Sequence, residues 1–401
     1  MNTSASTDSS KKNSILAQLT GASFSFYMSN AAVISYLAVF LYSMGYSETQ
    51  VGVITAINSA LSIISAPLWG MLADRWRSVV RAILICGGVG GLAYAMIPAI
   101  AGIEVAGFPV VLVLIPFAMF FRTPTTSLVD NFFLRQSEKH KLNYGIMRAT
   151  GSFSFAIASI LFGLIVPKTG AAVTFYIAAV LFIPALTLVF SASRGEEPIK
   201  TERIPLKDMR FGELFGNSQL VSYLFLSSIF GALLYCNGNF LPRLLESIGV
   251  DGGRVGIVMG AKAFVEVPFI ALLPWLRKRF RLEWVIGVAG LMFAVQAIVF
   301  SMSTAFWQII LISLLMDGVG AGLFYATSST YVFSLAPDHL KATAATCVGA
   351  MSSLSGVVGN LLGGMLSDRF GVQTYYLVMG LLGGAAALIF IFTRKRTASS
   401  R

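Results

Sequence analysis

The chain alternates long apolar runs with short polar breaks. A bilayer core about 30 Å thick needs about 20 apolar residues per crossing. Twelve runs meet that length, and we expect transmembrane helices over 15–42, 50–73, 80–101, 108–134, 144–166, 171–193, 218–245, 254–276, 282–301, 305–335, 342–366 and 373–393. The longest polar break, 194–217, divides them six and six. The pattern predicts an all-α integral membrane protein with two six-helix bundles, over 15–193 and 218–393.

Composition supports a membrane protein. The 401 residues are 56% hydrophobic and 12% charged, whereas soluble domains carry about 25% charged residues. The net charge of +11 lies in short clusters between apolar runs, which argues against a nucleic-acid face. Because the first apolar run is long and has no clear cleavage site, we expect it to be retained as a helix. The three cysteines (Cys86, Cys236, Cys347) fall in apolar runs and are expected to pack without disulfides.

The placement of Lys and Arg predicts the orientation. With the N-terminus inside, the outer loops hold four basic residues, and most of the other basic residues fall in inner loops and tails. This asymmetry follows the positive-inside rule. We therefore expect a cell-membrane protein with both ends cytoplasmic, a disordered tail over 1–14, a cytoplasmic central loop over 194–217 and a second tail over 394–401.

The two halves resemble each other around their first outer loop. YSMGYSETQVGVITA (42–56) matches LESIGVDGGRVGIVMGA (245–261), and four residues of the first stretch recur at a constant offset of 204 in the second. A constant offset indicates a duplicated unit. Halves related in this way are expected to form a cavity at mid-membrane.

GMLADRWRSVVR (70–81) follows the second helix. It resembles the cytoplasmic signature of the major facilitator superfamily, in which an Asp–Arg latch links neighbouring helices and breaks as the halves rock. The matching residues are Gly70, Asp74, Arg75, Arg77 and Arg81, with Arg77 in place of a signature glycine. The alternative is a solvated loop charge pair. GGMLSDRFG (363–371) repeats the motif but ends at an outer loop, and we expect no gating role for it.

Three further stretches are similar to the lactose-permease-like branch of sugar, nucleoside and aromatic-acid symporters. They are FYMSNAAVISYLAVFLYSMGYSETQVG (26–52), TSLVDNFF followed by YGIMRATGS, and VEVPF (265–269). The resemblance implies a twelve-helix transporter without a cofactor, which binds a small molecule and protons in the bilayer and works as a monomer.

Six charges fall inside predicted helices: Arg122, Asp130, Arg148, Lys262, Glu266 and Asp317. Charges at membrane depth are costly and need partners or a wet cavity. Lys262 and Glu266 are four residues apart and can pair on one helix face. Asp130 and Arg148 can meet if the facing sides of their helices agree.

The resemblance assigns substrate binding to Asp130 and Arg148, because acid and arginine bind the sugar in lactose-permease-like proteins. The alternative is a structural ion pair. Neutral candidates for the same cavity are Asn30, Phe155, Tyr235 and Asn239. Each of these is also a candidate for interhelical packing.

Proton coupling needs an acid that can change its charge during transport. We expect that role at Glu266 beside Lys262, with Asp317 and Arg122 as further candidates. Both histidines, His140 and His339, fall in predicted inner loops, so the coupling chemistry must differ from that of lactose permease. A buried structural pair is the alternative for Lys262 and Glu266.

The sequence favours proton-coupled symport of a sugar or similar polar solute by alternating access. Proton-coupled efflux of a sugar or drug is the second interpretation, because Arg122 resembles an arginine of drug antiporters. An enzyme is disfavoured, since no histidine lies at membrane depth and no serine or cysteine there has an obvious base.

Overall fold

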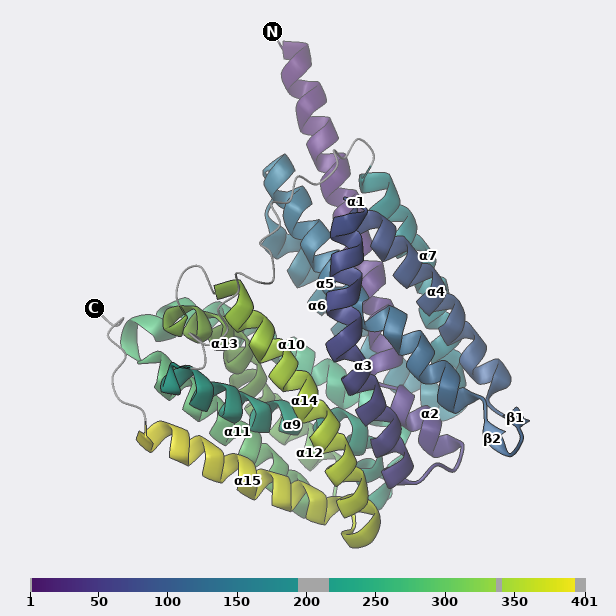
Figure 1. The fold of residues 1–401 in the computed structure, drawn as a ribbon, viewed down its shortest axis with the longest axis vertical. Coiled ribbons are helices and arrows are strands. Elements are labelled where there is room, and N and C mark those ends of the chain that lie inside the picture. The colour runs from purple at the N-terminus through teal and green to yellow at the C-terminus, as the bar shows by residue number, and fades with distance from the viewer. Residues whose placement is uncertain (1, 194–215, 337–340, 394–401) are drawn as a thin grey trace. The chain divides into compact units, whose positions relative to one another are not determined.

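The computed structural model of the protein describes residues 2–193, 216–336 and 341–393. The described chain is almost entirely helical (Figure 1). Each of the twelve predicted spans corresponds to one helix or to consecutive helices. Ten of the described helices are long and apolar enough to cross a membrane, and a shorter apolar helix covers 306–322. The prediction of an all-α membrane fold is confirmed.

By contacts the chain forms two units. Unit 1 is Met1–Phe40 with Leu61–Thr201, and unit 2 is Leu41–Ala60 with Glu202–Arg401. One division falls between Thr201 and Glu202, inside the predicted central loop, and residues 41–60 group with unit 2. Another division therefore falls inside the second membrane helix, between Ala60 and Leu61.

Unit 1 contains α1 (Asn2–Ile34), the start of α2 (Leu37–Ser43), the second part of α3 (Glu48–Arg75), α4 (Val79–Ile100), α5 (Val111–His140), α6 (Tyr144–Thr169) and α7 (Ala172–Ala192). Helix α1 packs on α6 and α7, and α4 packs on α5 and α7. A hairpin of β1 (Glu104–Val105) and β2 (Phe108–Pro109) joins α4 to α5, with Ala106 and Gly107 at positive φ in its two-residue turn, as tight hairpins require.

Two expectations for unit 1 are corrected. The structure carries α1 back to Asn2 instead of leaving a disordered tail over 1–14. No glycine or proline precedes Gly21, so the run lacks the two strongest helix breakers. The first predicted span is also interrupted, because α1 ends at Ile34 and α2 begins at Leu37.

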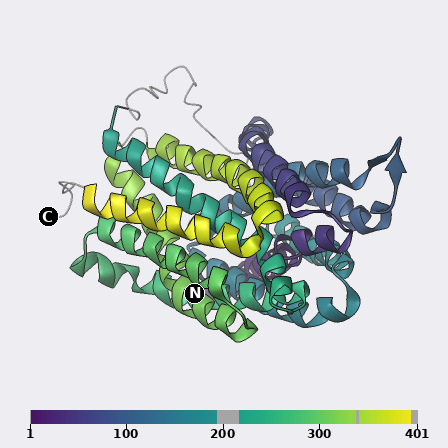
Figure 2. The ribbon, with the colours of Figure 1, turned by 90° about the horizontal axis from the view of Figure 1, so that it is seen from below.

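Unit 2 contains the C-terminal helices and residues 41–60. Its elements are α9 (Ser218–Ser247), η2 (Gly252–Arg254), α10 (Val255–Arg279), α11 (Leu282–Met302), α12 (Phe306–Asp317), η3 (Gly318–Gly322), α13 (Leu323–Leu335), α14 (Lys341–Phe370) and α15 (Val372–Thr393). Helix α15 lies along α11 and α9, and α14 lies along α9 (Figure 2). Segment η3 is a π-helix inside the tenth span, a deviation that often marks functional positions.

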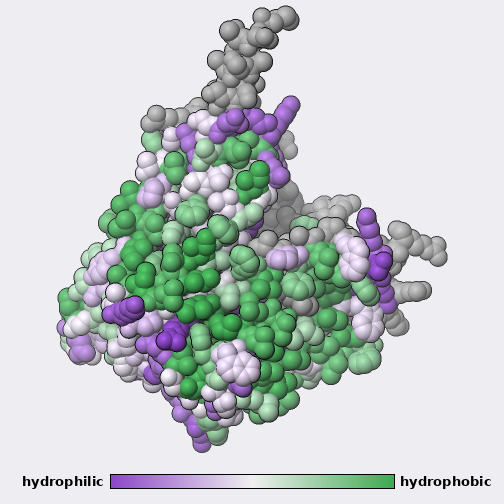
Figure 3. Space-filling view, turned by 180° about the vertical axis from the view of Figure 1, so that it is seen from behind, coloured by the Kyte–Doolittle hydropathy of each residue, from purple (hydrophilic) through white to green (hydrophobic). Residues whose placement is uncertain are grey.

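The surface has the distribution expected in a bilayer. Apolar residues cover broad areas of the face shown in Figure 3, and hydrophilic residues gather in smaller patches. Large apolar side chains on both units are exposed, among them Leu92 at 70%, Phe225 at 67% and Phe392 at 81%. Exposed apolar area on this scale indicates a lipid-facing surface.

The predicted duplication recurs in the backbone. Gly45 and Gly249 both have positive φ, at 85° and 76°. The amide of Gly45 donates to the Tyr42 carbonyl and that of Gly249 donates to the Glu246 carbonyl, both at 3.0 Å. Two positions 204 residues apart thus end their helices with the same left-handed turn, a conformation that glycine adopts without strain.

Candidate functional site

The polar site of unit 1 is built around Tyr27 on α1. Its hydroxyl donates to Asp130 Oδ1 at 2.9 Å. The Arg148 guanidinium carbon lies 4.9 Å from the centre of the Tyr27 ring, a cation–π contact. One tyrosine therefore contacts both charged side chains that the sequence predicts as a pair.

Asp130 and Arg148 make no direct ion pair within 4 Å among the described residues. Asp130 is half-buried and Arg148 is exposed. Because Tyr27 occupies only part of their hydrogen-bonding capacity, the carboxylate can still accept and the guanidinium can still donate. We call Tyr27, Asp130 and Arg148 the tyrosine site.

Small residues on α6 and α1 make this arrangement possible. A Cβ atom added at Gly151 would come within 2.8 Å of Cε2 of Tyr27 and 2.9 Å of Ser23 Oγ. Ser23 itself donates to the Met147 carbonyl at 2.7 Å. The family-like run YGIMRATGS therefore supplies Arg148 and, three residues later, the glycine that admits the tyrosine.

Arg122 lies deep in unit 1 and is 5% exposed. Its guanidinium carbon is 4.0 Å from the centre of the Phe182 ring and 5.3 Å from that of Phe26. Nη1 donates to Thr125 Oγ1 at 3.1 Å, and Nη2 has no hydrogen-bond partner among the described residues. The structure thus surrounds Arg122 with aromatic rings, and among the described residues no carboxylate lies within 4 Å of it.

The charged site of unit 2 joins three helices. Lys262 Nζ on α10 lies 3.1 Å from Asp317 Oδ2 on α12. Gln296 on α11 donates its side-chain amide to the same oxygen. All three side chains are buried. We call Lys262, Gln296 and Asp317 the lysine site.

The ion pair described for Lys262 is made with Asp317 on another helix, and its predicted pairing with Glu266 stays a prediction. The glycine-rich π-helix after Asp317 makes the contact between the helices possible. A Cβ atom at Gly322 would come within 3.0 Å of the Glu266 carbonyl, so this small segment lets α10 approach closely enough for Lys262 to reach Asp317.

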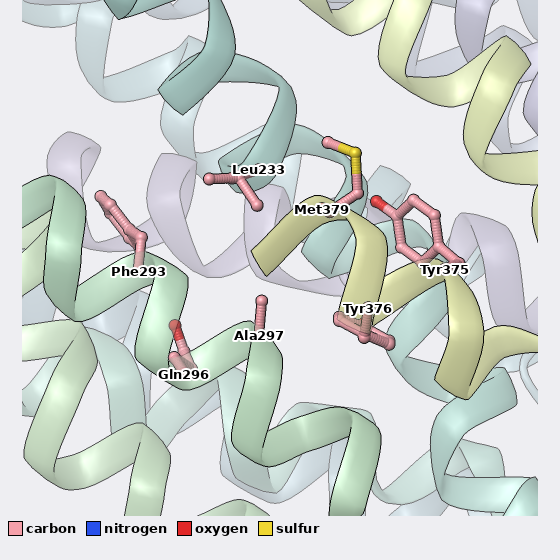
Figure 4. Close-up of a pocket in the computed structure, with 7 residues that line it drawn as sticks. All are labelled: Leu233, Phe293, Gln296, Ala297, Tyr375, Tyr376 and Met379. Atoms are coloured by element: carbon pink, nitrogen blue, oxygen red, sulfur yellow. The ribbon is translucent and has the colours of Figure 1, made fainter. Parts of the chain in front are cut away.

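A small cavity adjoins the lysine site (Figure 4). Its volume is about 10 Å³, and its lining residues are Leu233, Phe293, Gln296, Ala297, Tyr375, Tyr376 and Met379. Gln296 Oε1 is buried and has no hydrogen-bond partner among the described residues. The volume is close to that of one water molecule and far below the several hundred Å³ of a small-molecule site, so a sugar cannot bind there.

The neutral candidates separate into different environments. Asn30 is buried, and Phe155 is half-buried against the hydrophobic core of unit 1. Asn239 donates to Asn360 Oδ1 at 2.7 Å, which joins α9 to α14 as an interhelical contact. The side chain of Tyr235 lies outside the described residues.

The GMLADRWRSVVR motif forms the turn between α3 and α4. Arg77 has φ of 51°, so it occupies the left-handed region at the position where the family signature has glycine. Its amide donates to the Asp74 carbonyl at 3.0 Å, and Ser78 caps α4 by accepting from the Arg81 amide at 3.3 Å. The side chains of Asp74, Arg75 and Arg77 are exposed, Gly70 is half-buried, and among the described residues Asp74 makes no ion pair.

Comparisons with known proteins agree with this architecture. The model of the MFS_1 like family, where MFS stands for major facilitator superfamily, matches residues 16–378. The chain belongs to this family. Major facilitators are membrane transporters and not enzymes. The predictions that the chain is a transporter of this superfamily and that it is not an enzyme are therefore confirmed.

Individual relatives of this major facilitator are distant. The maltose permease of Geobacillus stearothermophilus is 24% identical over 384 residues, which cover 94% of each chain. The uncharacterized transporter YwbF of Bacillus subtilis is 23% identical over 94% of this chain and 93% of its own. A multidrug resistance protein MdtG of Salmonella paratyphi A is 23% identical over 90% and 89%. The crystal structure of the nucleoside transporter NupG superposes with a TM-score of 0.81 at 17% identity, over 95% of this chain and 100% of that one, which shows a shared fold.

The sequence analysis of this major facilitator did not single out three residues that make the contacts described here: Tyr27, Gln296 and Asp368. Tyr27 lies three residues before Asn30, one helical turn away, and that spacing could have singled it out. Gln296 is a lone amide in an apolar run and gave a weaker signal. Asp368 lies in the repeated motif at 363–371, but on the last turn of α14 and not in an outer loop.

Proposed function

We propose that this major facilitator is a proton-coupled symporter of a sugar or similar polar solute, with the tyrosine site as part of its substrate site. The observation that carries the proposal is the double contact of Tyr27 with Asp130 and Arg148. An exposed guanidinium offers forked donors to neighbouring hydroxyls, and a half-buried carboxylate accepts from them. The maltose permease among the relatives supports a sugar as the first substrate to test.

The lysine site is the proposed coupling site. A proton on Asp317 would cancel its charge and release Lys262 from the ion pair. Because a buried charge without its partner is costly, Lys262 would then favour a conformation that gives it another partner. Binding of a proton would thus be linked to a conformational change, as alternating access requires.

We also propose that both chain ends are cytoplasmic and that the protein lies in the cell membrane as a monomer. The support for this orientation is the excess of Lys and Arg in the loops assigned to the inside.

The test is uptake by purified protein in proteoliposomes. We expect labelled maltose, or another sugar found by a thermal-shift screen, to accumulate when the lumen is alkaline, and a protonophore to abolish accumulation. Arg148→Lys should reduce uptake at least tenfold, because an ammonium cannot form the forked contact. Lys168→Arg, an exchange at an exposed position of the same helix, is the matched control. Uptake by Arg148→Lys at the control rate would refute the substrate role.

Proton-coupled efflux is the second candidate. It is supported by the relatives named multidrug resistance protein MdtG and by Arg122 on α5. Under this alternative, cells that express the protein would accumulate less of a fluorescent drug, and a protonophore would restore accumulation. Maltose uptake without any effect on drug accumulation would decide for symport.

A further inference from the structure

The start of α3 is capped by an acid from another helix. Asp368, on the last turn of α14, accepts from the amides of Glu48 at 3.0 Å and Thr49 at 2.7 Å. It also accepts from the Ser47 hydroxyl at 3.0 Å. A carboxylate at a helix N-terminus gains both charge-assisted hydrogen bonds and a favourable interaction with the helix dipole. All four residues belong to unit 2.

The backbones around this contact are in close approach. A Cβ atom added at Gly364 would lie 2.6 Å from the Glu48 carbonyl oxygen and 2.9 Å from the Thr49 Cα. A Cβ atom at Gly52 would clash with the Asn360 carbonyl. Two glycines, one on each helix, therefore allow the Asp368 carboxylate to reach the end of α3.

Arg243 on α9 holds the same segment from a second direction. Its Nε lies 3.7 Å from Glu48 Oε1, and its guanidinium carbon lies 4.2 Å from the centre of the Tyr42 ring. Nη1 is 2.7 Å from Glu246 on its own helix. Residues 41–60 are thus fastened to both α9 and α14.

The two copies of the internal repeat cap their helix starts differently. With the offset of 204, Ser47 corresponds to Asp251, and Thr49 corresponds to Gly253. In the second half the Gly253 amide donates to Asp251 Oδ1 at 2.7 Å, two residues away. In the first half Ser47 stands in place of the acid. Its hydroxyl accepts from the Gln50 amide at 3.3 Å, and the carboxylate comes from Asp368, 319 residues from Thr49.

Asp368 also lies in a copy of the family signature. GMLSDRF (364–370) repeats GMLADRW (70–76) with the same spacing from glycine to aspartate. A Cβ atom at Gly70 would meet no atom within 4 Å, whereas Gly364 is tightly packed against α3.

We propose that Asp368 is a conformational latch that fastens residues 41–60 to unit 2 and releases them during transport. Helix α3 continues beyond Ala60 into unit 1, so releasing its start frees one end of a helix that belongs to both units. The latch rests on the transport activity of the family and not on the substrate or the proton coupling. It gives the repeated motif at 363–371 a gating role that the sequence did not predict.

Hydrogen–deuterium exchange of the purified full chain tests the latch without a substrate. In Asp368→Asn we expect the amides of 48–49 to exchange at least fivefold faster than in the wild type. Ser47→Asp supplies a local carboxylate like that of the second half and repels Asp368, so it should release the segment while the amides of 48–49 stay protected. Arg369→Gln, at the exposed neighbour of Asp368, is the control and should change neither the exchange of the 48–49 amides nor the attachment of the segment.

The distant end of α3 distinguishes a latch from a simple cap. If Asp368 is a latch, the rate of amide exchange over 70–81 should change at least twofold in both Asp368→Asn and Ser47→Asp, and in the same direction. A disulfide in Ser47→Cys/Asp368→Cys should shift this rate in the opposite direction, and a reductant should reverse the shift. Exchange over 70–81 that equals the wild type in all three proteins would overturn the proposal. Because no sugar or pH gradient is used, this result is independent of whether the symport proposal survives.

Discussion

Lys262 and Asp317 neutralise each other inside unit 2, where neither charge could remain alone at low cost. Their nearest atoms are 3.1 Å apart, and the two side chains are 10% and 4% exposed. Removing one partner of a buried pair costs about 3–5 kcal/mol, whereas replacing both by neutral groups is often tolerated. The pair therefore makes separate predictions for stability and for coupling.

Lys262→Met alone should lower the free energy of unfolding by about 3 kcal/mol because Asp317 loses its counter-ion. The double variant Lys262→Met/Asp317→Asn should regain most of the lost free energy of unfolding. Thermal unfolding in detergent measures the stability of both variants. In proteoliposomes the double variant should move sugar only down its gradient, without response to pH. Accumulation driven by a pH gradient in the double variant would exclude the lysine site as the coupling site.

Gly151 makes a second prediction at this scale. Gly151→Ala would place a methyl group against Tyr27, and overpacking of this kind costs about 1–3 kcal/mol. We expect Tyr27 to be displaced and substrate affinity to fall at least tenfold, measured by ligand-induced thermal shift. Gly88→Ala, where the added Cβ meets no atom within 4 Å, is the matched control. An unchanged affinity in Gly151→Ala would show that Tyr27 does not organise the site.

At the scale of elements, the α3–α4 turn contains a strained position. Arg77 has φ of 51°, and a side chain in the left-handed region costs about 1–2 kcal/mol. Glycine removes that strain but gains entropy in the unfolded chain. The turn is stable because Ser78 caps α4 and because apolar residues on both sides, Ala73 and Val79, are buried.

Arg77→Gly should therefore stabilise the protein by about 1 kcal/mol, seen as a higher midpoint of thermal unfolding. Arg75→Gly, inside the last turn of α3, should instead destabilise it by about 1 kcal/mol, because glycine is a poor helix former. If Arg77→Gly lowered the midpoint, the guanidinium would have to make a stabilising contact that outweighs the strain.

Elements whose pattern is local were predictable from the sequence. Apolar run length predicted the twelve spans, and the repeat at 42–56 and 245–261 predicted the duplication that recurs in two matching helix ends. The break after Ile34 was not predictable, because no glycine or proline marks it. The predicted pairing of Lys262 with Glu266 used spacing along one helix, whereas the pairing with Asp317 depends on the approach of α10 to η3.

At the scale of the whole molecule, the family and fold followed from the sequence, while the sites required the structure. Asp130 and Arg148 were predicted through a family resemblance, but Tyr27, which contacts both, comes from a different helix. The unit boundary inside α3 could not be predicted either, because it also depends on contacts between segments far apart in the sequence. Residues 41–60 are continuous with unit 1 along the chain, and only contacts over long sequence separations assign them to unit 2.

The cap on α3 has a consequence for synthesis of the protein. Ser47 and the carboxylate that it contacts are 321 residues apart. At translation rates of about 5–20 residues per second, the ribosome needs roughly 15–60 s to make the intervening chain. During that time the start of α3 lacks its acid, whereas the matching helix start of the second half is complete two residues after Asp251 emerges. In a chain truncated before α14, Ser47 and Gln50 could still cap α3, but the carboxylate of Asp368 would be missing.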